Sequence, residues 1–366
     1  MLPEDMSRTP AADELQHLKQ VSRAKHVILS NYFQPWAVIL GSRNLRLTYV
    51  DCFAGPGEYE MRGSPVEGSP VIAVRKAIDL VSKGQVQNLS LYLVEADEEQ
   101  LRRLQTTLAK IGKYPKGLTV QSECGDSKLI VPRLLDGLPP SAPAFFFVDP
   151  YGHPLPLPTI RRILMRPRTE VLINLMWFQM NRDLNNPKVE ARLDELFGNT
   201  QWRNQPFIHL HGDARETAFL EYFKSQLGCP FVLEFRIRHD PEDTHGGDRT
   251  KYYLLHGSSH IKAALLMKDV MWQLGDEEGT FDYSADTQGN LFRQTPPEQE
   301  LLAALRREFT GKELTFDQLR ERTWKLPFIG KHYRSVIKSN EGNGIIITRV
   351  ESKRTGVKGL DRIRFS

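Results

Sequence analysis

The stretch "TYVDCFAGPGEYE", Thr48 to Glu60, is the part of the sequence that best indicates the fold. It joins a β-rich run ending in Asp51 to two glycines, Gly55 and Gly57. Because glycine has no Cβ atom, it permits a tight turn and lets another group approach the main chain closely. A strand that ends in an acid just before such a turn predicts a ligand site at that strand end.

On both sides of this stretch, strand-like runs alternate with helix-like runs. The expected parallel strands are "LRLTYVDCF", "LSLYLVEAD", "LTVQSECGD", "AFFFVDPYG" and "EVLINLMW". Ser69 and Pro70, as N-cap and first helical residue, predict the start of the first intervening helix. This alternation is typical of a parallel sheet covered by helices on both faces. Two further runs, "FVLEFRIR" and "YYLLHGSS", are expected to pair antiparallel at its edge.

The pattern divides the chain into four regions. Residues 1–45 are expected to be a helical segment that packs on the core and breaks near Pro35, and residues 46–275 the α/β domain with a polar helical insertion ending near Phe197. Residues 276–296 are interpreted as a linker. Residues 297–366 predict three helices and a two-stranded hairpin, a winged-helix-like module in which Thr315 and Gln318 form a capping box.

Charge is distributed unevenly between these regions. Residues 301–366 hold 15 lysines and arginines against 7 acidic residues, whereas the rest of the chain holds 34 against 38. A basic module on a mildly acidic body predicts contact with DNA or RNA. The alternative is a solvated face of a protein-docking module. The basic residues concerned are Arg320, Arg322, Lys325, Lys331, Arg334, Lys338, Lys353 and Arg354.

Several classes of protein do not fit the composition. No apolar run approaches the roughly 20 residues of a membrane-spanning helix, and the N-terminus lacks a secretory pattern, so a cytoplasmic protein without membrane contact is expected. Cys52, Cys124 and Cys229 are too far apart for paired ligands and are interpreted as reduced, buried thiols. His209 and His211 would share one face of a strand, but without a third ligand no metal site is expected.

The other strand ends also carry polar residues. Glu95 is placed to accept the hydroxyl protons of a ribose, and Asp126 to accept a hydrogen bond from the exocyclic amine of a purine. Each acid alone could instead be a charge at a helix N-terminus. The next helix begins a dozen residues after Gly57, and neither a G-x-G-x-x-G fingerprint nor a P-loop is present. A nucleoside without phosphates is therefore favoured over a dinucleotide.

The fourth strand end holds Asp149, Pro150, Tyr151 and Gly152. A carboxylate on a stiff proline turn can accept a hydrogen bond from an amine while the neighbouring ring stacks on the base that carries it. The alternative is a strand-to-helix turn in which Asp149 is an N-cap.

The order "DCFAGPG", "VEAD", "CGD", "DPYG" resembles class I S-adenosylmethionine-dependent methyltransferases, especially those that methylate amines. The last motif is similar to the "DPFG" of tRNA guanine-N2 dimethyltransferases. Nearly the whole chain resembles the bacterial three-Cys-motif partner proteins (TcmP), through "KHVILSNYFQPW", "YVDCFAGPGEYE", "GSPVIA", "FFFVDPYG", "YYLLHGSSH", "MKDVMW" and "LPFIGKHYRSVI". The resemblance implies a Rossmann-like class I methyltransferase fold with an antiparallel edge strand, and a neighbouring radical-SAM-like partner.

Two functions from different classes follow. The first is a methyltransferase that uses S-adenosylmethionine and acts on an amino group of a nucleic-acid base. The second is a catalytically inactive adaptor that binds nucleic acid or the three-Cys-motif protein. In the first, Asp149 and Tyr151, on the turn with Pro150 and Gly152, orient the acceptor nitrogen. The cofactor residues are Asp51, Phe53, Ala54, Gly55, Gly57, Glu95 and Asp126.

Overall fold

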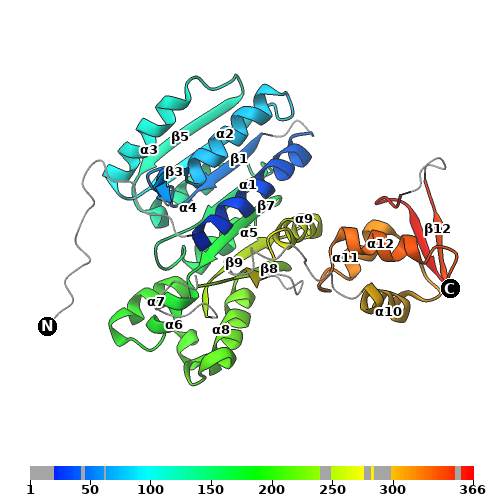
Figure 1. Ribbon diagram of the computed structural model, residues 1–366. Helices are drawn as coiled ribbons and strands as arrows, with labels where there is room; N and C mark the ends of the chain where they lie inside the picture. Colours follow the sequence, from blue (N-terminus) through cyan, green and yellow to red (C-terminus); the bar gives the residue numbers. More distant parts are fainter. Residues whose placement is uncertain are drawn as a thin grey trace.

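The computed structural model describes residues 20–42, 46–61, 63–239, 249–275, 282–283, 298–350 and 356–366. Within them, the main body is a sheet with helices on both faces, and a smaller C-terminal module stands to one side of it (Figure 1). The strand order of the sheet is β10-β8-β9-β7-β6-β1-β4-β5.

Five neighbouring strands of this sheet are parallel. The strands β4 and β5 are added on one side of β1, and β6 and β7 on the other, so the strand order reverses between β1 and β6. They are β1 (Leu47–Asp51), β4 (Leu89–Glu95), β5 (Leu118–Cys124), β6 (Ala144–Val148) and β7 (Thr169–Leu175). This mostly parallel arrangement is the Rossmann-like class I methyltransferase fold that was expected. In such sheets, ligands bind outside the carboxyl ends of the strands where the order reverses.

The two later runs pair antiparallel, as predicted, as β8 (Phe231–Arg238) and β9 (Thr250–Ser258). The antiparallel member is β9, which lies between β7 and β8 and is antiparallel to both. A two-residue strand, β10 (Asp282–Tyr283), pairs parallel with β8. The sequence predicted only linker at this position, because two residues leave no recognisable period. The other residues of the expected linker lie outside the described residues.

The two faces of the sheet form two cores because side chains alternate along each strand. In β6, Phe145 and Phe147 belong to one core, and Phe146 and Val148 to the other. The helices contributing to the first core are α1 (Gln20–Gly41), α2 (Ser69–Ser82), α3 (Glu98–Ile111) and α9 (Ile261–Trp272). Those contributing to the second are α4 (Ser127–Gly137), α5 (Leu157–Leu164), α6 (Trp177–Asp183), α7 (Glu190–Phe197) and α8 (Gly212–Gln226).

The break expected near Pro35 does not occur, since α1 continues through it to Gly41. Proline removes one backbone hydrogen bond from a helix interior. Here the aromatic side chains of Tyr32, Phe33 and Trp36 are buried on either side of it, which holds both halves of the helix against the sheet.

Several local predictions were wrong. Gly68, not Ser69, is the N-cap of α2. A hairpin of β2 (Glu58–Met61) and β3 (Ser64–Glu67) separates the glycine turn from α2, and neither this hairpin nor α8 was foreseen. His211 is the N-cap of α8 and shares no strand with its neighbour. Cys124 is exposed rather than buried. Short 3-10 turns η1 (Pro187–Val189), η2 (Gln201–Asn204) and η3 (Pro206–Ile208) connect the insertion helices.

The C-terminal module has its own hydrophobic core. Its elements are α10 (Glu298–Phe309), β11 (Glu313–Thr315), α11 (Phe316–Arg322), α12 (Gly330–Ser339), β12 (Ile345–Thr348) and β13 (Arg362–Phe365). The sheet has three antiparallel strands, in the order β11-β13-β12, where a two-stranded hairpin was expected. The capping box of Thr315 and Gln318 is confirmed.

The module docks on α9 of the body. The Asp269 carboxylate on α9 accepts hydrogen bonds from the Arg320 guanidinium at 3.1 Å and from the backbone N–H of Gly330 at 3.2 Å. Lys268 of the same helix donates to the backbone carbonyls of Trp324 and Leu326. No helix within the described ranges is long and apolar enough to cross a membrane.

Candidate functional site

Three of the predicted acids lie at adjacent strand ends. Asp51 is the last residue of β1, Glu95 is the last residue of β4, and Asp149 directly follows β6. Since β1 pairs in parallel with both β4 and β6, these ends meet at the same edge of the sheet, where the strand order reverses. This edge is the position at which doubly wound sheets bind ligands.

The glycine turn after β1 is held against the end of β4. The backbone N–H of Gly55 donates to Glu95 Oε2 at 2.7 Å, and the N–H of Ala54 donates to the carbonyl of Val94 at 2.8 Å. Gly55 and Gly57 have φ angles of 65° and 81°, a conformation that costs other residues energy. The expectation of a tight turn is therefore correct, and the turn brings Glu95 beside it.

Asp51 is fully buried at the base of this turn. Burial raises the pKa of its carboxyl to about 7, although hydrogen bonds from Ser69, the Phe53 backbone and Tyr49 favour the ionised form. The Phe53 N–H and the Tyr49 hydroxyl each lie 3.3 Å from a carboxyl oxygen. The side chain therefore titrates near neutral pH, unlike an exposed aspartate.

Asp149 forms a compact polar cluster with Lys25 and Asn174, two residues for which the sequence predicted no role. Lys25 Nζ of α1 lies 2.6 Å from one carboxylate oxygen, and Asn174 Nδ2 of β7 donates to the other at 2.7 Å. The remaining Asn174 oxygen is buried and has no hydrogen-bond partner within the described parts of the chain. His26 lies next to Lys25, and its pKa is lowered to about 4, mainly by burial and also by the Lys25 charge.

Tyr59 of the unforeseen hairpin lies over the glycine turn. A Cβ atom added to Gly55 would come within 3.0 Å of the Tyr59 hydroxyl, and one added to Gly68 would lie 2.7 Å from the ring. The hydroxyl also hydrogen-bonds to Tyr151, whose side chain is 85% exposed. Burial raises the pKa of Tyr59, and the nearby Asp149 charge raises it further.

The remaining predicted residues have ordinary structural partners. Asp126 is the N-cap of α4 and accepts from the Lys128 N–H at 2.8 Å, which is the alternative considered for it. The second oxygen of Glu95 accepts from the Asp97 N–H at 2.9 Å. Asp149 is not an N-cap, because α5 begins only at Leu157. Pro150 is buried and Gly152 is partly exposed beside Tyr151.

Some of the missed residues carried a signal in the sequence. Asn174 is a polar residue inside the otherwise apolar run "VLINLMW", and Lys25 begins "KHVILSNYFQPW". Tyr59 lies in the quoted glycine stretch itself, but only the hairpin brings its ring back over Gly55. Nothing in the spacing of Lys25 and Asp149 along the sequence indicates their contact.

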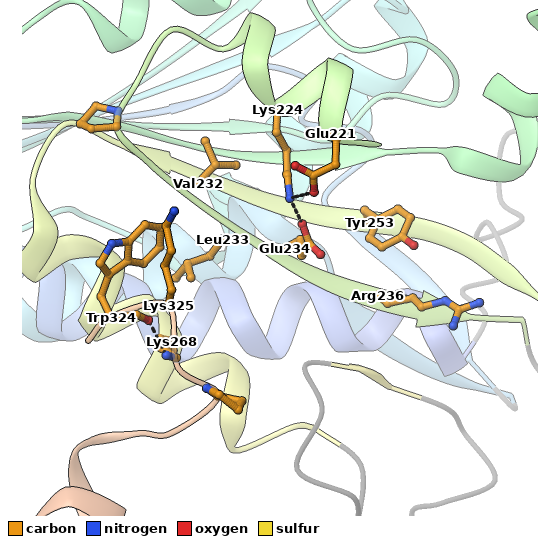
Figure 2. A pocket seen from close by; sticks show the side chains of 12 residues that line it. Glu221, Lys224, Val232, Leu233, Glu234, Arg236, Tyr253, Lys268, Trp324 and Lys325 are labelled. Carbon is orange, nitrogen blue, oxygen red and sulfur yellow. Dashed lines mark hydrogen bonds and ion pairs between the residues drawn. The ribbon is translucent and has the colours of Figure 1, made fainter. Parts of the chain in front are cut away.

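Two cavities lie apart from this edge, and neither Asp51, Glu95 nor Asp149 lines them. The larger, about 740 Å³, lies between α8, β8 and the segment 324–327 (Figure 2). Figure 2 shows Trp324 and Lys325 at one end of it, Arg236 and Tyr253 at the other, and the Lys224–Glu234 ion pair of 2.5 Å between them. The smaller, about 320 Å³, is lined by residues that include Lys128, His153, Arg192 and Glu195.

The predicted basic residues of the module differ in their surroundings. Arg320 is half-buried in the junction with α9. Arg334 lies 5.0 Å from the centre of the Phe316 ring, and Lys331 lies 6.0 Å from that of Trp272. The exposed members of the set are Arg322, Lys325, Lys331, Arg334 and Lys338. Lys353 and Arg354 lie outside the described residues.

Comparisons with solved structures return methyltransferases at low identity. Trm1 from Pyrococcus horikoshii, solved with S-adenosyl-L-methionine, is 10% identical, covers 96% of this chain and 94% of its own, and gives a TM-score of 0.33. A SAM-dependent methyltransferase from Agrobacterium tumefaciens is 9% identical, over 66% of this chain and 63% of its own, with a TM-score of 0.34.

A Legionella pneumophila protein of the DUF519 family is 14% identical, over 65% of this chain and 85% of its own, with a TM-score of 0.37. No family model matches the chain, and no curated protein matches it. The fold assignment therefore rests on the strand order and directions of this chain. Among the described residues, no three His, Cys, Asp or Glu side chains cluster as a metal site requires.

Proposed function

We propose that this protein is a methyltransferase that uses S-adenosylmethionine to methylate an amino group, and that the acceptor is a base of a nucleic acid. The observation that supports this best is the meeting of Asp51, Glu95 and Asp149 around the glycine turn at one sheet edge. Asp51 beside the turn would serve the amino-acid end of the cofactor, Glu95 its ribose, and Asp149 the acceptor amine.

The residues at this edge fit the cofactor. Glu95 has one N–H on each oxygen, and a carboxylate can accept about four hydrogen bonds, so it retains capacity for ribose hydroxyls. Asp126 is proposed to accept from the adenine amine, and Asp51 to lie at the amino-acid end. Phe53, Ala54, Gly55 and Gly57 line that end. When bound, the cofactor supplies an electrophilic methyl group.

On the acceptor side, Asp149 and the unpartnered Asn174 oxygen are two acceptors for the hydrogens of an amine. Holding both hydrogens aims the nitrogen lone pair toward the methyl group, and such alignment accounts for a large part of the rate. The Lys25 ammonium, 2.6 Å from one oxygen, holds the Asp149 carboxylate in place. The exposed Tyr151 ring, on the turn with Pro150 and Gly152, would stack on the base.

The nucleic-acid part of the proposal rests on the C-terminal module. We interpret residues 297–366 as a winged-helix-like domain, joined by a linker at 276–296 to the α/β domain at 46–275, on which residues 1–45 pack. Its exposed lysines and arginines, with Lys353 and Arg354, would contact phosphates. Binding of the full chain to single-stranded RNA or DNA should then weaken steeply with rising salt, with a log–log slope of about −0.7 per phosphate contact.

The family assignment is part of the same proposal. The resemblance to three-Cys-motif partner proteins supports a radical-SAM-like partner encoded by a neighbouring gene, and a bacterial, cytoplasmic setting. Copurification of the two proteins from one expression strain tests the partnership.

Calorimetric titration with S-adenosylmethionine tests the activity at its first step. We expect binding by the purified chain and a loss of at least about tenfold in Glu95→Ala, since two or more hydrogen bonds to ribose are lost. Tritiated methyl transfer to total DNA, RNA and protein fractions then identifies the acceptor. Absence of cofactor binding in the unaltered chain would rule out the activity.

The adaptor alternative is favoured by one observation, the occupation of the site by the chain's own side chains. Tyr59 covers Gly55, and Lys25 is paired with Asp149. If the protein is an adaptor, Asp149→Ala leaves nucleic-acid and partner binding unchanged and no methyl transfer is found in any fraction.

A further inference from the structure

Tyr59 occupies a position between the two halves of the proposed site. Its hydroxyl lies on the side of Gly55 that a Cβ atom would occupy, where the methionine portion of the cofactor is proposed to lie. The same hydroxyl hydrogen-bonds to Tyr151, which follows Asp149 on the acceptor side. One phenol group therefore touches both the turn after β1 and the turn after β6.

The ring of Tyr59 is held in this position by the hairpin. It packs against Gly68, whose N–H donates to the carbonyl of Gly57 at 2.8 Å and so closes the loop that carries the hairpin. Both Gly55 and Gly68 have to be free of a Cβ atom for the ring to lie there. The glycines at positions 55 and 68 are therefore needed in part to make room for the Tyr59 side chain.

A ligand group that reaches the Gly55 face meets the Tyr59 hydroxyl first. Moving that hydroxyl breaks its hydrogen bond to Tyr151. The exposed Tyr151 side chain then loses its hydrogen bond with Tyr59, and its ring can turn toward an acceptor base.

We propose that Tyr59 is a positioning residue that links the two half-sites: the methionine portion of S-adenosylmethionine displaces the Tyr59 hydroxyl from Gly55, and this releases Tyr151 to stack on the acceptor. The inference rests on the proposed function. It assigns a role to a residue outside the cofactor and acceptor sets, and it makes cofactor binding the first step.

The test uses the full-length protein with 3-fluorotyrosine in place of tyrosine and fluorine NMR. The Tyr151 signal is identified by its loss in Tyr151→Phe. The matched variants are Tyr59→Phe, which retains the ring on Gly68 and removes only the hydroxyl, and Tyr253→Phe, which removes a hydroxyl bonded to Glu216 at 2.6 Å elsewhere in the body. S-adenosylmethionine is the probe, and calorimetry measures its dissociation constant in each protein.

In the unaltered chain, S-adenosylmethionine is expected to shift the Tyr151 signal. In Tyr59→Phe the signal should already lie near the shifted position and move by less than about a fifth as much. The affinity for S-adenosylmethionine should rise about two- to tenfold in Tyr59→Phe, because no hydrogen bond has to be broken, and stay unchanged in Tyr253→Phe.

Different failures have different meanings. If the cofactor binds but the Tyr151 signal does not move, or moves equally in Tyr59→Phe, the link is wrong while the proposed cofactor site stands. If calorimetry shows no binding in any of the proteins, the proposed function fails, and the link with it.

Discussion

Substitution of Gly55 by alanine should destabilise the protein by more than its backbone conformation explains. At a φ of 65° an alanine costs about 1–2 kcal/mol, because its Cβ approaches the following carbonyl. The new Cβ would also come too close to the Tyr59 hydroxyl, whereas the next ring atom, Cζ, lies at a comfortable 3.6 Å. The least costly relief is to move the hydroxyl and lose its hydrogen bond to Tyr151, which costs about 1 kcal/mol.

The free energy of unfolding should therefore fall by about 2–3 kcal/mol in Gly55→Ala, the sum of those two costs. Gly63, in the turn of the same hairpin, is the matched control, with a φ of 78° and nothing within 4 Å of an added Cβ. Gly63→Ala should lose only the backbone cost, about 1–2 kcal/mol. Urea unfolding followed by far-UV circular dichroism gives each value.

A second background isolates the cause. Tyr59→Phe removes the clashing oxygen, so Gly55→Ala made in that background should cost no more than Gly63→Ala. If Gly55→Ala costs the same whether residue 59 is tyrosine or phenylalanine, the Tyr59 hydroxyl does not lie over Gly55.

Three further predictions concern the acids. Because the folded pKa of Asp51 is raised from 3.8 to about 7, its contribution to stability is complete below pH 4 and is lost as pH rises to 7. Asp51→Asn should lack this loss, so its free energy of unfolding in urea should rise by a few kcal/mol relative to the unaltered protein between pH 4.5 and 8. Parallel curves of unfolding free energy against pH would contradict this. Asp149→Asn should reduce methyl transfer by at least about 100-fold with cofactor affinity within threefold, as single-turnover assays and calorimetry would show; a full rate would exclude Asp149 from the reaction. Asp269→Asn should cost about 1–3 kcal/mol of unfolding free energy, since Arg320 and Gly330 both donate to its carboxylate. Adding Arg320→Gln to this variant should lower the unfolding free energy little further, and additive losses would mean that Asp269 and Arg320 do not interact.

The parallel part of the fold could be predicted because its signals are local. The strands β1, β6 and β7 are short runs that are buried along their whole length, and full burial on both faces makes such runs nearly continuous in apolar residues. The capping box of Thr315 with Gln318 was equally visible, since both partners lie within one helical turn.

Elements whose state depends on distant partners were missed. Pro35 reads as a helix break, but the buried aromatic residues around it keep α1 continuous. Within the α/β body, β9 lies between β8 and β7 because it pairs with β7. The length of the loop between β8 and β9 does not reveal this order. The helix α8 has apolar residues only on a small part of its length, and its burial comes from the insertion packed beside it.

A parallel sheet with an acid and a glycine turn at the end of its first strand can be predicted from the sequence alone, because these features depend on residues close together in the chain. Which side chains surround that turn depends on contacts between segments that are distant in the chain. Lys25 comes from α1, Tyr59 from the hairpin and Asn174 from β7, and only the packing of these elements brings them to Gly55 and Asp149. Contacts between distant segments follow from packing over the whole domain, and no short stretch of sequence contains that information.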